Sequence, residues 1–264
     1  MRLMGVVNVT PDSFSDGGRF LTPARAIDHA LALLAAGADV IDVGGESTRP
    51  GSQPTSADEE LARVIPVLEG LRARVDAPLS IDTQKAAVAA AALAAGAEII
   101  NDVSALADEG MAALAARTGA GLVLMHMRGQ PRDMQDDPRY DDVVEDVRAF
   151  LDGRVEAAVA AGVPRDRILV DPGIGFGKTL EHNVALLAGL PRLRSLGCRV
   201  LVGLSRKGMI GALTGRPIEA RAAGSVGGAL AAVAAGADVV RVHDVAETVD
   251  ALAVWGALTA GGSR

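Results

Sequence analysis

The sequence predicts a (β/α)8 barrel, an α/β fold in which a single TIM-barrel domain spans residues 1–264. A phrase recurs along the chain: an Ala-rich stretch, a glycine, and a short apolar run that stops at a polar residue, most clearly in residues 234–243. The apolar runs are continuous, which is typical of parallel strands covered by helices on both faces. Eight such units would average about 33 residues, and a barrel of this class needs roughly 250 in all.

The glycine of each repeat is expected to end a helix, because glycine adopts the left-handed conformation after the last turn without a Cβ penalty. These glycines are Gly37, Gly96, Gly119, Gly162, Gly197 and Gly236. A strand is expected after each of them. Two further strands, at residues 3–8 and 78–82, complete the set of eight, and residues 141–161 and 246–258 are expected to be helices.

The composition restricts the class of protein. Apolar residues make up 49% of the chain and aromatic residues only 2%, so the predicted core consists of Ala, Val, Leu and Ile. A formal net charge of -7 argues against nucleic-acid and membrane-surface partners, which usually require a basic face. We expect a soluble, cytoplasmic protein, because the sequence contains neither a signal peptide nor an apolar stretch of the ~20 residues that span a bilayer.

Every expected strand ends in a polar residue, and the active sites of such barrels lie at the carboxyl ends of the strands. In chain order these residues are Asn8, Asp42, Asp82, Asn101 with Asp102, His126, Asp171, Ser205 with Lys207, and Arg241 with His243. The rare residue types are concentrated there. The chain has only three lysines, Lys85, Lys178 and Lys207, and each lies just beyond an expected strand. This placement predicts a functional rim.

Two connections after strands, residues 9–21 and 44–57, are long and polar, and the first is expected to act as a mobile lid. Residues 171–179 are rich in glycine, which lets backbone amides approach a ligand. Pro172 and Lys178 occupy positions where a phosphate-binding loop and a dinucleotide-binding loop, respectively, require glycine. The chain also lacks the spacing of a catalytic zinc site. ATP, NAD and zinc are therefore not expected.

The remaining residues suit the recognition of an anionic heterocycle. Arg241 and His243 alternate on one strand and share a face, as a platform for a diphosphate would require. Asp82 and Asp171 can accept N–H groups of a ring, while Lys207 and Asn101 can donate to its carbonyl or ring nitrogen. This pattern favours a pterin-like or guanine-like ligand. The alternative is an internal salt-bridge network that closes the top of the barrel.

Several motifs, in their order along the chain, resemble those of the dihydropteroate synthase family. They are residues 8–18 (NVTPDSFSDGG), 45–51 (GESTRPG), 82–85 (DTQK), 101–104 (NDVS), 124–127 (LMHM), 171–178 (DPGIGFGK), 205–207 (SRK) and 241–243 (RVH). The resemblance spans essentially the whole chain. It implies condensation of 7,8-dihydropterin-6-ylmethyl diphosphate with 4-aminobenzoate, which releases diphosphate and gives 7,8-dihydropteroate for folate synthesis.

The resemblance also implies Mg2+ as a cofactor, a homodimer, and a role for each matching residue. The pterin ring would be held by Asp82, Asn101, Asp171 and Lys207. The diphosphate would be bound by Arg241 and His243, with Asn8 as a ligand of Mg2+, and Thr48 would lie at the site of the pterin diphosphate. The aminobenzoate pocket would be bordered by Phe14, Pro50, Phe176 and the start of the helix after Lys207, and Asp16 and Arg49 would close with the two loops.

The chain departs from the usual family pattern at two places. Ala86 and Ala87 replace a Pro and a Glu that follow the DTxK motif in many members, and Gly208 replaces a serine after the SRK motif. The second change removes a hydroxyl near the expected aminobenzoate carboxylate. Three other functions remain as alternatives: a non-catalytic pterin-binding paralogue, a pterin-dependent methyltransferase that uses a corrinoid protein, and a metal-dependent barrel hydrolase. Sulfonamides, which resemble aminobenzoate, are expected inhibitors.

Overall fold

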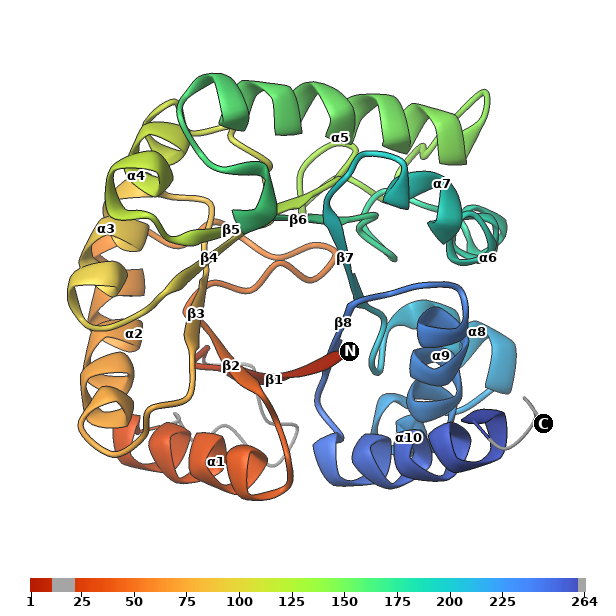
Figure 1. Ribbon diagram of the computed structural model, residues 1–264, viewed down its shortest axis with the longest axis horizontal. Coiled ribbons are helices and arrows are strands. Elements are labelled where there is room, and N and C mark those ends of the chain that lie inside the picture. Colours follow the sequence, from red (N-terminus) through yellow and green to blue (C-terminus); the bar gives the residue numbers. More distant parts are fainter. Residues whose placement is uncertain (11–21, 261–264) are drawn as a thin grey trace.

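The computed structural model describes residues 1–10 and 22–260, and in them the predicted barrel is confirmed. Eight parallel strands close into one barrel in chain order, with β8 paired to β1 (Figure 1). The strands are β1 (Arg2–Asn8), β2 (Val40–Gly44), β3 (Leu79–Asp82), β4 (Ile99–Asp102), β5 (Gly121–Met125), β6 (Ile168–Asp171), β7 (Arg199–Gly203) and β8 (Val239–Val242). All of the strands therefore point their carboxyl ends to one rim.

The helices form an outer ring around the strands (Figure 1). They are α1 (Pro23–Ala35), α2 (Ala57–Arg72), α3 (Ala86–Ala94), α4 (Gly110–Thr118), α5 (Val143–Ala160), α6 (Leu180–Ala188), α7 (Leu190–Arg194), α8 (Gly208–Thr214), α9 (Ala222–Ala234) and α10 (Val245–Ala260). Short 3-10 turns, η1 (Arg165–Arg167) and η2 (Ile218–Ala220), precede β6 and α9. No helix in the described ranges is long and apolar enough to cross a membrane.

The local signals in the sequence explain where these elements end. All six repeat glycines have positive φ angles, from 69° at Gly119 to 105° at Gly37. Side chains at the helix starts shift some predicted bounds. The helix expected from residue 141 begins at Val143, because the Asp142 side chain accepts the N–H groups of Val144 and Glu145 and so caps it. The strand expected from residue 78 begins at Leu79.

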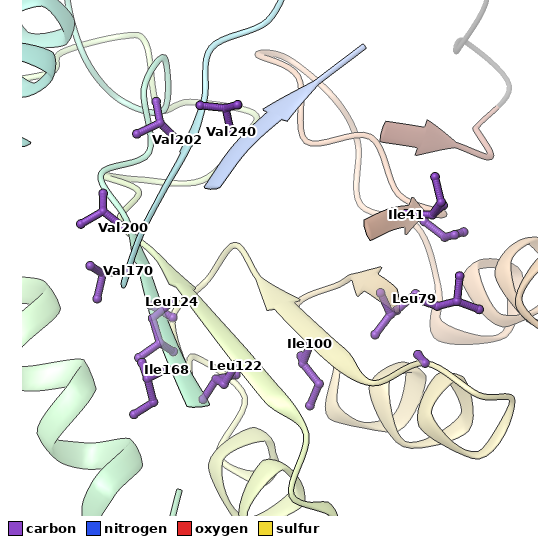
Figure 2. Packing of buried hydrophobic residues seen from close by; sticks show 14 of the residues in the cluster. Ile41, Leu79, Ile100, Leu122, Leu124, Ile168, Val170, Val200, Val202 and Val240 are labelled. Atoms are coloured by element: carbon purple, nitrogen blue, oxygen red, sulfur yellow. The ribbon is translucent and has the colours of Figure 1, made fainter. Parts of the chain in front are cut away.

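Successive side chains of each strand face opposite sides of the barrel wall. The outward-facing ones, such as Ile41, Leu79, Ile100 and Leu122, are fully buried against the helices (Figure 2). The inward-facing ones form two successive layers. We call the first the apolar layer, and it consists of Met4, Val40, Ile99, Val123, Leu169, Leu201 and Val239. We call the second the polar layer, and it consists of Asp42, Asp82, Asn101, Asp171 and Arg241.

The polar layer lies one pleat closer to the carboxyl rim than the apolar layer. Asp42 follows Val40 by two residues, and Arg241 follows Val239 by two, so each pair shares the inward face of its strand. The strand register pairs Asp82 with Asn101, whereas Asp42 pairs with Ser80. The Arg241 side chain contacts both Asp42 and Asp82. The fold therefore concentrates charge at the carboxyl end of the barrel interior.

Candidate active site

Arg241 is the centre of the polar layer. Its Nε donates to Asp42 Oδ2 at 2.6 Å, and its Nη2 donates to Asp82 Oδ2 at 2.8 Å. The amide nitrogen of Asn101 donates to the same Asp42 oxygen at 3.0 Å. The Asp42 side chain is completely buried, and that of Asp82 is 11% exposed. One guanidinium therefore joins residues from β2, β3 and β8 across the barrel mouth.

The polar layer contains more carboxylates than this guanidinium can neutralise. Burial raises the pKa of Asp82 to about 7, and Arg241 opposes that rise. Burial also raises the pKa of Asp171, against the opposing effect of Lys207. Both carboxylates thus gain from additional N–H donors. A heterocycle that presents several ring N–H groups would supply them at this point of the barrel.

Asp171 and Lys207 lie at the ends of β6 and β7. Asp171 Oδ1 accepts the Gly173 amide at 2.7 Å, and Lys207 Nζ donates to the Ile174 carbonyl at 2.6 Å. The ammonium also lies 4.4 Å from the centre of the Phe176 ring. Burial lowers the pKa of Lys207 to about 8, although Asp171 acts in the opposite direction. These contacts place a cation and an aromatic face beside the polar layer.

His243 lies directly after β8, two residues beyond Arg241, and contacts Ser205. Its Nδ1 lies 3.1 Å from Ser205 Oγ, and that hydroxyl also accepts the His243 amide at 3.2 Å. Burial, and then the neighbouring Arg241, lower the pKa of His243 to about 3. The imidazole is therefore neutral near pH 7, and it can offer an anion a hydrogen bond without a positive charge of its own.

The glycine-rich connection after β6 packs closely against protein backbone. A Cβ at Gly173 would lie 1.8 Å from the His126 carbonyl oxygen, and one at Gly177 would lie 2.4 Å from that of Arg128. Both glycines have positive φ. The sequence suggested that such glycines admit a ligand, whereas the contacts in the structure are with the end of β5.

Two of the residues that follow strands, His126 and Lys178, contact each other at this connection. Lys178 is 3% exposed, and its Nζ lies 2.9 Å from His126 Nδ1 and donates to the Phe176 carbonyl at 2.9 Å. Burial lowers the pKa of Lys178 to about 7 and that of His126 to about 3. His126 and Lys178 thus join the ends of β5 and β6 instead of entering the polar layer.

The loop residues of the predicted site lie around the mouth. Thr48 is half-buried and lines a cavity of about 380 Å³ between the β2–α2 loop and the connection after β5. Arg49 and Pro50 are exposed next to it. Phe176 is half-buried, and α8 begins directly after Lys207. Phe14 and Asp16 lie outside the described residues.

Asn8 ends β1 beside Gly44, its partner in the strand register. A Cβ on Gly44 would lie 3.7 Å from Asn8 Oδ1 and 3.6 Å from Asp82 Oδ2. The absence of a side chain at this position leaves space between the two oxygens. Asn8, Asp82, Asn101, Asp171 and Arg241 therefore surround one mouth, as the sequence predicted.

Asp42 is the polar-layer residue to which the sequence assigned no role. It was among the strand-end residues, and a carboxylate inside the apolar run 40–43 was the available signal. Asp102 also ends a strand, but it lies outside the site. It faces outward and accepts the amides of Ser104 at 2.9 Å and Leu106 at 2.7 Å, which fixes the turn after β4. Of these two strand-end carboxylates, only Asp42 belongs to the site.

A second hollow, of about 350 Å³, lies at the opposite end of the barrel. Two of its three arginines have acidic partners: Arg194 pairs with Asp238 at 3.1 Å, and Arg165 pairs with Glu156.

Comparison with known families gives one match over most of the chain. Residues 4–243 match the family described as pterin binding enzyme. This match covers most of the chain, from within β1 to just beyond β8. The chain therefore belongs to the pterin-binding enzyme family.

More specific relatives are dihydropteroate synthases. The enzyme from Neisseria meningitidis serogroup C is 52% identical over 262 residues, which cover 97% of this chain and 92% of the relative. A Xanthomonas albilineans synthase solved with 4-aminobenzoic acid is 55% identical, with a TM-score of 0.92 over 98% of this chain and 93% of that one. A Yersinia pestis synthase solved with a sulfonamide drug is 49% identical, with a TM-score of 0.94 over 98% and 94%. Within its family, the chain belongs to the dihydropteroate synthases, which are transferases.

Proposed function

We propose that this chain condenses 7,8-dihydropterin-6-ylmethyl diphosphate with 4-aminobenzoate at the mouth of the barrel. The observation that carries the proposal is the polar layer, in which Asp82, Asn101 and Asp171 face inward beneath Lys207. The two carboxylates accept N–H groups of the pterin ring, and Lys207 and Asn101 donate to its acceptors. Asp42 positions Arg241 and Asn101 through the bonds at 2.6 and 3.0 Å.

The diphosphate of the substrate lies above the pterin pocket in this proposal. Arg241 supplies a cation, His243 supplies a neutral hydrogen bond, and Thr48 supplies a hydroxyl at the edge of the loop. Two of the Arg241 nitrogens are bonded to carboxylates in the structure. Binding of the pterin ring to Asp82 would release Nη2 for the phosphate oxygens. The pterin pocket and the diphosphate site are thus coupled through one side chain.

We also propose that Mg2+ accompanies the diphosphate. Among the described residues, no three His, Cys, Asp or Glu side chains lie close enough together to hold a metal ion by themselves. Mg2+ commonly binds one or two protein oxygens together with phosphate oxygens and water. Asn8 Oδ1, with Asp82 nearby across Gly44, fits that requirement. When bound, the ion would neutralise charge on the leaving diphosphate.

The chemistry requires no protein nucleophile. The bond between the pterin methylene carbon and oxygen breaks, the diphosphate departs with the electron pair, and the pterin ring stabilises the resulting cation. The aminobenzoate nitrogen then forms the new carbon–nitrogen bond and loses a proton. Positioning and preorganised charge are therefore the contributions of Asp82, Asp171, Lys207, Arg241 and His243.

The aminobenzoate is proposed to lie between Phe176, Arg49, Pro50 and the start of α8. Phe176 offers a ring face, and Arg49 is an exposed cation that can reach a carboxylate. The sulfonamide complex of the Yersinia pestis relative supports inhibition of this chain by the same class of compound.

An assay of product formation tests the proposed function. The protein is incubated with the pterin diphosphate and 4-aminobenzoate, and diphosphate and dihydropteroate are measured with Mg2+ and with EDTA. We expect equal amounts of the two products with Mg2+ and no formation of either product with EDTA. Tight binding of the pterin diphosphate without product would instead favour the pterin-binding paralogue.

We also propose that the protein is a cytoplasmic homodimer. The exposed Val254 and Leu258 of α10 are candidate contacts between the two copies. A monomer found by light scattering would refute the dimer.

A further inference from the structure

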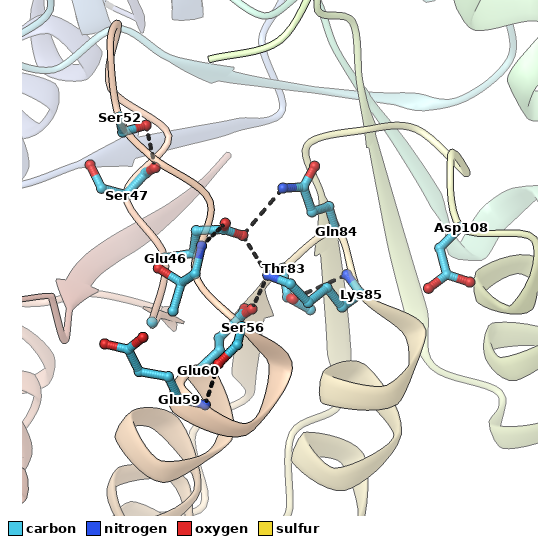
Figure 3. A network of polar contacts seen from close by, with 12 residues as sticks. Glu46, Ser47, Ser52, Ser56, Glu59, Glu60, Thr83, Gln84, Lys85 and Asp108 are labelled. Carbon is cyan, nitrogen blue, oxygen red and sulfur yellow. Dashed lines mark hydrogen bonds and ion pairs between the residues drawn. The ribbon is translucent and has the colours of Figure 1, made fainter. Parts of the chain in front are cut away.

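Two charged residues of the family motifs have no part in the proposed chemistry. They are Glu46, in the loop between β2 and α2, and Lys85, at the turn between β3 and α3. Lys85 Nζ donates to Glu46 Oε2 at 2.7 Å (Figure 3). The Glu46 side chain is only 5% exposed, so the ion pair is largely shielded from water. An ion pair with this degree of burial is screened less by salt than a surface pair.

Glu46 also joins the two ends of the β2–α2 loop. Its Oε1 accepts the backbone amide of Thr55 at 2.8 Å, so the two ends of the segment 46–55 meet at one carboxylate. Its Oε2 additionally accepts the Gln84 amide nitrogen at 3.2 Å. The loop residues proposed to meet the substrates, Thr48, Arg49 and Pro50, lie inside this closed segment. Their path therefore depends on where Glu46 is held.

Lys85 is itself held by a rigid frame. Its backbone amide donates to Thr83 Oγ1 at 3.2 Å, and the next amide, that of Ala86, donates to Asp108 Oδ2 at 2.9 Å. Its ammonium has a second partner, Glu60 Oε2 of α2, at 2.6 Å. The Glu60 side chain is fully buried, and its other oxygen has no hydrogen-bond partner in the described part of the chain. Lys85 thus links the turn between β3 and α3 to the β2–α2 loop and to the first turn of α2.

The rest of the loop has few comparable attachments in the described residues. Ser52 Oγ donates to the Ser47 carbonyl at 2.6 Å, and the Gly51 amide donates to the Pro131 carbonyl at 2.9 Å. The first of these bonds lies within the loop. The second joins it to the connection after β5. Glu46 provides the ion pair that attaches the loop to Lys85, just after β3.

We propose that Lys85 is a positioning residue that sets the conformation of the β2–α2 loop through Glu46, and thereby the affinity for 4-aminobenzoate. The proposal rests on the proposed function, because it assigns Arg49 and Pro50 to the aminobenzoate side. Lys85 touches no reacting atom. The pterin ring is held on strands, so its binding depends less on this loop than aminobenzoate binding does.

Glu46→Gln and Glu60→Gln form a matched pair of variants, because each neutralises one of the two carboxylates that share Lys85. Only Glu46 belongs to the loop. We expect Glu46→Gln to raise the KM for 4-aminobenzoate about tenfold and that for the pterin diphosphate by no more than about threefold. Glu60→Gln should leave both constants within about twofold of wild type.

Hydrogen exchange of residues 46–55 provides a measurement that does not depend on turnover. Faster exchange of this segment in Glu46→Gln, and not in Glu60→Gln, would agree with the proposal. Equal changes in the two variants, or none in Glu46→Gln, would overturn it. If the wild-type protein formed no dihydropteroate, the proposed function would fail, and the exchange result would still decide whether Glu46 holds the loop.

Discussion

The two inward-facing layers of the barrel have the same architecture and opposite chemistry. The apolar layer fills the interior with side chains such as Met4, Val123 and Leu201, which form a cluster with one another. The polar layer, one pleat further along, contains carboxylates whose charges are incompletely balanced. Burial of apolar area stabilises a fold, whereas a buried charge without a full set of partners costs stability. The difference indicates that the first layer supports the barrel and the second binds a ligand.

The largest expected effect comes from removing Arg241 of the polar layer or Lys207 beside it. Lys207→Ala and Arg241→Ala should each lower turnover at least about 100-fold, because loss of one preorganised donor typically costs about 3 to 4 kcal/mol of barrier. Steady-state assays of dihydropteroate formation would measure this loss. Circular dichroism must confirm a folded barrel, since Arg241→Ala also leaves Asp42 buried without its guanidinium. Near-native turnover in a folded variant would refute that residue's assignment.

A truncation in the apolar layer should have the converse effect. Leu201→Ala removes a fully buried side chain, and we expect it to lower the free energy of unfolding by about 3 kcal/mol. Turnover per folded molecule at a temperature well below the transition should change less than about threefold. Denaturant unfolding and active-site titration would provide the two numbers. A large loss of turnover without loss of stability would contradict the division between the layers.

The pH dependence should be the smallest effect and should come from Asp82 of the polar layer and from Lys207 beside it. Asp82, with a pKa raised to about 7, accepts two ring N–H groups best when ionised, so kcat/KM for the pterin diphosphate should rise through that pH. Lys207, with a pKa lowered to about 8, loses its charge as pH increases, so kcat/KM should fall above it. Lys207→Arg should move the falling limb to higher pH. A flat profile between pH 6 and 9 would contradict these assignments.

The barrel and the membership of its rim could be predicted from the sequence, because both depend on local patterns. A glycine after an Ala-rich helix determines where a strand begins, and the strand's last residue then lies at the rim. The inward or outward direction of that residue could not be predicted in the same way. When both faces of a strand are apolar, the sequence does not show which of its residues face inward. The directions of Asn101 and Asp102 therefore could not be told apart from the sequence.

Contacts between distant connections were equally invisible in the sequence. Asp42 bonds to Arg241, 199 residues away, and Lys85 bonds to Glu46, 39 residues away. Both pairs follow from barrel closure and from the path of a loop, which no local pattern encodes. The sequence placed His126 correctly at the rim, but its contact with Lys178 gives it a structural role.

A crystal structure with the pterin diphosphate bound would show whether the polar layer is the pterin site. We predict that the pterin ring lies on the polar layer, within hydrogen-bond distance of Asp82, Asn101, Asp171 and Lys207, and that Arg241 Nη2 leaves Asp82 for a phosphate oxygen. A ring bound elsewhere, such as in the cavity beside Thr48, with both carboxylate bonds of Arg241 intact, would contradict it.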